Sequence, residues 1–135
     1  MRGGVVAVVA GLTLLGGCAR DATGPADIQV EGVYHLATVN GASLPFLIQQ
    51  DSASRVDVTE SVLTLNHDKT WSEVVLYRVV EYGQTTTPSQ MSIGTYTTLN
   101  GAVELTDSNG ASAHGAVSGN FLTLLDSGFG LVYRR

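Results

Sequence analysis

Cysteine, proline and basic side chains are all scarce in this chain. Its 135 residues include one cysteine, three prolines and seven Lys or Arg against twelve Asp or Glu, for a net charge of −5. Because Cys18 stands alone, the folded domain has no intramolecular disulfide, no Cys/His zinc cluster and no thiol nucleophile. Phosphate contacts dominate nucleic-acid affinity, and the largest basic cluster is Arg134-Arg135, so we expect no nucleic-acid partner.

Catalytic and cofactor motifs are also missing. Serine and threonine are plentiful, but there is no Gly-x-Ser-x-Gly elbow and no glycine-rich phosphate loop before a helix. We expect His35, His67 and His114 to lie on the surface, on elements too far apart to share a metal ion. The sequence therefore predicts no enzyme activity, no metal and no cofactor. Four carboxylates alternate with apolar neighbours and are predicted to face outward from strands: Asp57, Glu73, Glu81 and Glu104.

The chain begins with the pattern of a secretory signal. A basic start, Met1-Arg2, precedes an apolar run from Val5 to Leu15. As a helix, this run would span about 16 Å, which is too short for a bilayer core of about 30 Å. We therefore interpret residues 1–17 as a signal peptide rather than a transmembrane anchor.

The end of that run, Leu15-Gly16-Gly17-Cys18, resembles the lipobox of bacterial lipoproteins. The resemblance implies cleavage before Cys18, lipidation of its thiol and attachment to a membrane of the cell envelope. Ala19 follows the cysteine, where the family carries aspartate for inner-membrane retention. In a cell with two membranes, this implies the outer membrane, facing the periplasm. The alternative is an ordinary signal peptide followed by an unmodified cysteine.

The remaining chain divides into a tether and one domain. Residues 18–31 contain Gly24-Pro25 and little apolar periodicity, which favours a flexible tether, with an edge strand at Ile28 to Val30 as the alternative. Residues 32–135 form the domain, where Val, Thr, Leu and Tyr are interrupted by Gly, Asn and Asp. Eight strands are predicted: Val33–Val39, Arg55–Asn66, Thr70–Tyr82, Ser92–Thr98, Ala102–Thr106, Ser112–Val117, Phe121–Leu125 and Phe129–Tyr133.

Three irregular features are expected among these strands. Leu44 to Ser54 lacks strand features and could hold one helical turn. A change of alternation phase predicts a bulge at Glu60-Ser61. Gly83 to Gln90 is predicted to be a polar loop, either a solvated hairpin end or a gate at the mouth of the domain.

Short connections force successive strands to pair antiparallel, which predicts a meander. A meander has two exposed edges, and pairing the first strand with the last removes both. We therefore predict an all-β fold, an eight-stranded antiparallel up-and-down barrel. A barrel of this size can fill its interior with side chains or hold one small ligand.

Several segments are similar to lipocalin-like proteins of bacteria. They are Gly32-Val33-Tyr34, the hairpin from Leu63 to Trp71, and three later segments, Gly94–Thr97, Gly119–Leu124 and Leu131–Arg134. Tyr34 stands where lipocalins carry tryptophan, and Lys69 replaces the usual turn glycine. The resemblance implies a lipocalin-like barrel that binds a small hydrophobic molecule, and it supplies no catalytic residues.

Aromatic and leucine side chains on the strands are the candidate lining of a ligand pocket. They either fill the core or leave room for a small amphipathic ligand, and a cavity above about 300 Å³ would favour binding. A filled interior would favour the alternative, a non-enzymatic structural or protein-interaction lipoprotein. The candidate residues are Tyr34, Leu36, Leu63, Leu65, Trp71, Tyr77, Tyr96, Phe121 and Tyr133.

Overall fold

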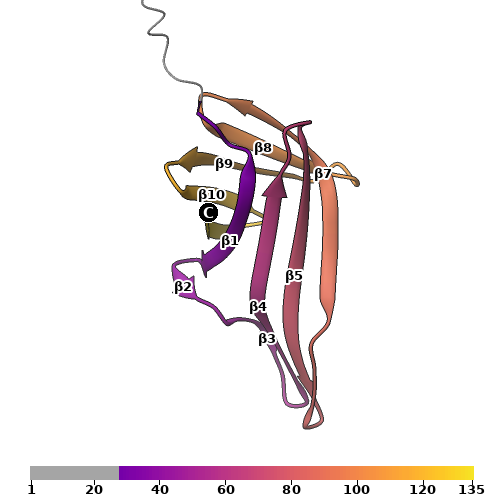
Figure 1. Cartoon of the computed structure of the whole chain (residues 1–135). Helices are drawn as coiled ribbons and strands as arrows, with labels where there is room; N and C mark the ends of the chain where they lie inside the picture. The colour runs from indigo at the N-terminus through magenta and orange to yellow at the C-terminus, as the bar shows by residue number, and fades with distance from the viewer. Residues whose placement is uncertain (1–27) are drawn as a thin grey trace, which may run out of the picture.

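The computed structural model describes residues 28–135, which form strands and turns without a helix (Figure 1). The predicted signal peptide, Cys18 and most of the predicted tether lie outside the described residues. Three short strands are β2 (Ala42–Ser43), β3 (Phe46–Gln50) and β6 (Gln84–Thr86). The eight main strands are β1 (Gly32–Val39), β4 (Ser54–Leu65), β5 (Thr70–Glu81), β7 (Ser89–Leu99), β8 (Ala102–Asp107), β9 (Ser112–Ser118), β10 (Phe121–Asp126) and β11 (Phe129–Arg134).

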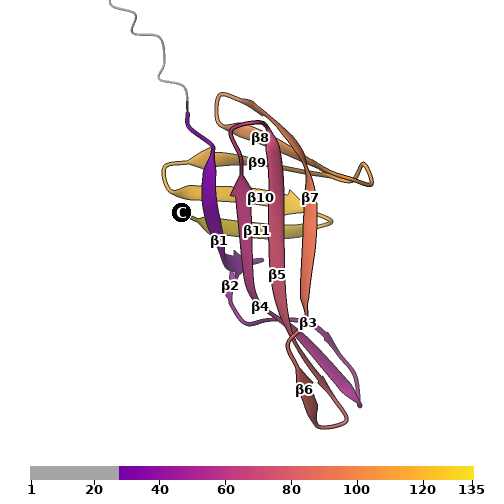
Figure 2. The ribbon, with the colours of Figure 1, turned by 45° about the vertical axis from the view of Figure 1, so that its right-hand side comes forward.

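The main strands close into an eight-stranded antiparallel barrel, as predicted. Each pairs with its neighbour in the chain, and β1 also pairs with β11, where Leu36 lies opposite Tyr133. On its other side, β1 pairs with β4 from Gly32–Leu65 to His35–Val62. In Figure 2, β8 to β11 run across the direction of β1, β4, β5 and β7, so two crossed groups of strands enclose the interior.

Two predictions about the connections are wrong. The segment from Leu44 to Ser54 holds β3 rather than a helical turn, because its residues pair along β4 from Phe46–Val58 to Gln50–Arg55. The predicted loop from Gly83 to Gln90 contains β6, which pairs with the end of β5, and the start of β7. The predicted bulge exists, but it lies between Val58 and Glu60, slightly earlier than expected.

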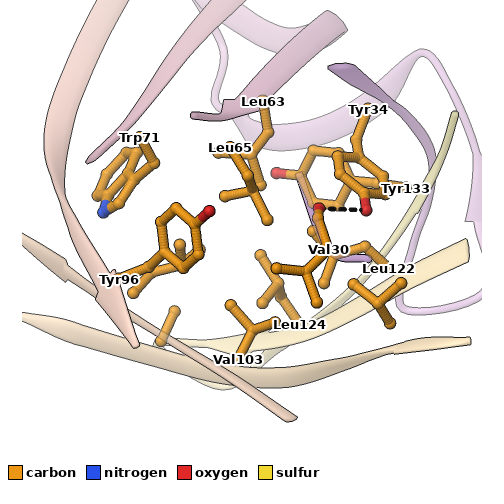
Figure 3. Close-up of a cluster of buried hydrophobic side chains, with 13 residues drawn as sticks. Val30, Tyr34, Leu63, Leu65, Trp71, Tyr96, Val103, Leu122, Leu124 and Tyr133 are labelled. Carbon is orange, nitrogen blue, oxygen red and sulfur yellow. Dashed lines mark hydrogen bonds between the residues drawn. The ribbon is translucent and has the colours of Figure 1, made fainter. Parts of the chain in front are cut away.

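One end of the barrel is filled by a packed core. Leu63 and Leu65 on β4 face Val103 on β8 and Leu122 and Leu124 on β10 across the interior (Figure 3). Four aromatic side chains also belong to this core: Tyr34, Trp71, Tyr96 and Tyr133. Val30, which precedes β1, is also buried in it, and its carbonyl accepts a hydrogen bond of 2.6 Å from Tyr34 Oη. Packing of the chain therefore begins before the first strand.

Gly94 provides the space that Trp71 needs in this core. The Trp71 indole Nε1 donates to the carbonyl oxygens of Thr95, at 3.0 Å, and Thr106, at 3.2 Å. A Cβ at Gly94 would lie 1.9 Å from the Thr106 oxygen and 2.7 Å from the indole nitrogen. Glycine inside a strand is typical of such a close approach. Gly94 therefore lets β7 and β8 meet around the indole.

We expect Gly94→Ala to lower the free energy of unfolding by about 1–3 kcal/mol, because backbone must shift to admit the methyl group. Gly130→Ala is the matched control. Its Cβ would come no closer than 3.7 Å to Asn40 Oδ1, so a change within about 0.5 kcal/mol is expected. Urea denaturation measures both. Equal effects of the two substitutions would contradict the close approach at Gly94.

Candidate ligand-binding cavity

A cavity of about 270 Å³ lies at the end of the barrel away from the packed core and opens to solvent. It forms where β1 leaves β4, because their pairing stops at His35–Val62 and β3 takes the place beside β4. Its wall is mostly apolar, with Leu36 and Val39 from β1, Val58 from β4 and Val75 from β5. A smaller hollow of about 110 Å³ adjoins it towards the turn that follows Asp107. Both spaces are lined by Glu73, Ser92, Asp126, Leu131 and Tyr133.

The carboxylate of Glu73 lies at the boundary between this cavity and the packed core. Its Oε1 accepts hydrogen bonds of 2.6 Å from Ser61 Oγ and 2.6 Å from Tyr133 Oη. Burial, followed by the proximity of Glu73, raises the pKa of the Tyr133 phenol, which therefore stays a hydrogen-bond donor at neutral pH. Hydroxyl donors on β4 and β11 thus hold one oxygen of a carboxylate on β5.

The prediction that Glu73 faces outward is wrong. Trp71, Glu73, Val75 and Tyr77 alternate on one face of β5, and Trp71 lies in the core. Glu73 therefore points inward. A carboxylate is tolerated there because two hydroxyls donate to it. Glu81 and Glu104 are exposed, as predicted, and Glu104 lies 3.7 Å from the His114 imidazole. Asp57 lies on the outer face of β4, but its carboxylate is buried there by ion pairs.

The candidate lining residues separate into three groups. Leu36, Tyr77 and Tyr133 line the cavity, and burial raises the pKa of the Tyr77 phenol. Phe121 was predicted to face inward, and this is wrong. It is 48% exposed because Leu122 and Leu124 occupy the inward positions of β10. The remaining five lie in the packed core, where Leu63 and Trp71 also line the smaller hollow: Tyr34, Leu63, Leu65, Trp71 and Tyr96.

Aromatic residues outside the predicted set form part of the cavity rim. Phe46 on β3 meets Phe129 on β11 edge to face, with ring centroids 6.3 Å apart. Both rings line the cavity. Sequence reasoning missed Phe46 because it assigned no strand there. It missed Phe129 although the residue was placed at the start of a strand.

Beyond the cavity, strands β3 to β6 extend past the barrel as a four-stranded sheet (Figure 2). On its outer face, the Asp57 carboxylate is 0% exposed. Arg55 Nε donates to its two oxygens at 3.2 and 3.0 Å, and an Arg78 guanidinium nitrogen donates at 2.9 Å. These two guanidinium groups hold the pKa of Asp57 below its usual value. The Arg78–Asp57 ion pair joins β5 to β4 next to the cavity wall, and the Arg55–Asp57 pair lies within β4.

The described residues offer few other chemical sites. His67 lies in a turn, 3.6 Å from Glu31, with its side chain almost fully exposed. Within residues 28–135, no cluster of His, Cys, Asp and Glu has the arrangement of a metal site. In the same part of the chain, no helix is long and apolar enough to cross a membrane.

No protein-family model and no curated protein matches the sequence. The lipocalin and lipoprotein resemblances therefore stay predictions from the motifs quoted above. The barrel, its cavity and the residues that line it are the basis for a functional proposal.

We expect Asp57→Asn to destabilise the fold, because it removes the charge that compensates Arg55 and Arg78. The folded pKa is lower than the unfolded value of about 3.9, so the ionised carboxylate favours folding. That contribution is complete above the unfolded pKa and is lost as pH falls through the folded pKa. Urea denaturation should therefore show that the variant has a lower free energy of unfolding than the unmodified protein at pH 7. The difference between the two proteins should be smaller at pH 3.

Glu60→Gln is the control for this experiment, since it removes an exposed carboxylate from the same strand. It should leave the unfolding midpoint nearly unchanged at both pH values. A deficit in Asp57→Asn that is the same at pH 7 and pH 3 would contradict the role of the ionised carboxylate.

Proposed function

We propose that this protein is a lipid-anchored protein of the cell envelope whose lipocalin-like barrel binds a small hydrophobic or amphipathic ligand without catalysing a reaction. The observation that carries the proposal is the cavity of about 270 Å³, with aliphatic walls, an aromatic rim and a few convergent polar groups. Ligand pockets combine such walls with a small number of placed polar groups. The volume falls short of the roughly 300 Å³ expected to favour binding, which is the lower end of the usual range for drug-sized ligands, so the proposed ligand is a smaller molecule.

The packed core at the other end of the barrel supports the alternative function, a structural or protein-interaction lipoprotein. Five of the nine candidate lining residues belong to the filled core rather than to the main cavity. In that function, the outer surface would make the specific contacts and the cavity would have no occupant. The two functions therefore differ in whether occupation of the cavity can be observed and blocked.

We expect Val75→Phe to weaken binding of the uncharged fluorescent probe N-phenyl-1-naphthylamine by about tenfold, because the larger side chain occupies cavity space. Val74→Phe is the matched control. The same substitution is made one residue earlier, where the side chain faces outward and is 39% exposed, and we expect it to leave binding unchanged. Fluorescence titration measures both. No saturable binding to the unmodified protein, or equal effects of the two variants, would favour the interaction function.

The lipid anchor rests on the lipobox resemblance at Cys18, which lies outside the described residues. We expect Cys18→Ser to move the protein from the membrane fraction to the soluble fraction, because a serine hydroxyl cannot form the thioether. Fractionation of cells expressing the full chain, followed by intact-mass measurement, tests this. A variant that stays in the membrane fraction would contradict the anchor.

A further inference from the structure

The carboxylate at the cavity floor carries an inference about ligand chemistry that rests on the proposed binding function. We propose that the cavity selects a small amphiphile with a protonated amine head and an apolar body, and that Glu73 is the residue that binds the amine. The proposed binding function leaves the charge of the ligand open.

One carboxylate oxygen of Glu73 is left for a ligand. Ser61 and Tyr133 both donate to Oε1. Oε2 accepts no hydrogen bond from any described residue. Every buried polar side-chain atom within residues 28–135 has a hydrogen-bond partner, so Oε2 is not a buried atom. Oε2 is therefore reached from the cavity, because Glu73 lines it and is not an exposed residue.

The charged side chains that line the cavity are all acidic. No Lys, Arg or His lines the main cavity or the smaller hollow beside it. Among the described residues, no ion pair joins Glu73 to a basic side chain, and the nearby Arg55 and Arg78 both bind Asp57. Asp126 is a second carboxylate in the lining, with its Oδ1 accepting from Ser127 Oγ at 3.0 Å. A cation entering the cavity therefore meets uncompensated negative charge.

The cavity walls suit an apolar body attached to that cation. Val75 lies on β5 with Glu73, Val58 lies on the neighbouring β4, and the Phe46 and Phe129 rings lie at the rim. An ammonium bound to Glu73 Oε2 would form a charge-assisted hydrogen bond, which is roughly twice as strong as a neutral one. A carboxylate ligand of the same shape would instead be repelled, because like charges in a partly desolvated site interact strongly.

Three ligands with the same chain and different heads test the proposal: n-hexylamine, 1-hexanol and hexanoate at neutral pH. We expect hexylamine to bind the full chain at least about tenfold more tightly than hexanol, with hexanoate weakest. Nuclear magnetic resonance titration measures the affinities and locates each ligand from shifts near Ser61 and Glu73. Equal affinity for the three ligands, or a preference for hexanoate, would overturn the inference.

Glu73→Gln then tests the residue itself. Glutamine keeps an acceptor for Ser61 and Tyr133 but has no charge, so the preference for hexylamine over hexanol should disappear while hexanol binding stays similar. The charge-matched control is Glu60→Gln, which should leave the preference intact. A preference that survives in Glu73→Gln would overturn the assignment. If that variant does not fold, the ligand series on the unmodified protein still decides the charge selectivity.

The outcomes separate this inference from the proposed function. If the naphthylamine probe and hexanol bind but hexylamine is not preferred, the inference fails and the binding function stands. If none of these ligands binds, both fail.

Discussion

The pairing of β1 with β11 is the constraint on which the rest of the structure depends. A meander that stayed open would leave backbone donors and acceptors unpaired along both edges. Closure places Leu36 opposite Tyr133 and Val39 opposite Leu131. Beyond the paired residues, Asn40 and Gly130 continue the seam, since the backbone N–H of Asn40 donates to the Gly130 carbonyl at 2.7 Å. The same closure brings Tyr133 to Glu73, which lies on a strand far from β11 in sequence.

Side-chain size then divides the interior of the closed barrel. At one end, Trp71, Tyr96 and Tyr34 fill the space between the crossed strands. At the other end, the inward positions of β4 and β5 carry Ser61 and Val75, and a cavity remains. Glu73 lies between these regions and accepts from donors on both sides. Its position is what makes the cavity amphipathic rather than simply apolar.

Most of the barrel could be predicted from the sequence because its turns have strong local signals. Asn40-Gly41, Asn100-Gly101 and Gly119-Asn120 each end a strand, and the eight predicted strands and their closure are confirmed. β3 could not be predicted in this way. Its residues alternate poorly, and it is extended because β4 is available beside it, which is a tertiary effect.

The cavity was harder to predict from the sequence than the barrel, although the alternation of residues along the strands indicated part of its lining. Trp71 and Tyr77 were both expected to face inward, and Glu73 has the same alternation phase, so its inward position could have been inferred. Leu122 and Leu124 likewise imply that Phe121 faces outward. The boundary between filled and hollow halves had no local signal, because it depends on side chains that meet from opposite strands.

Residue-resolved amide hydrogen exchange of the full chain tests the closed barrel most directly. β6 is an internal reference for an edge, since among the described strands it pairs with β5 alone. We expect hydrogen-bonded amides in the β1–β11 seam, around Leu36 and Tyr133, to exchange as slowly as those between β4 and β5. Seam amides that exchange as fast as those of β6 would contradict the closure and the cavity that depends on it.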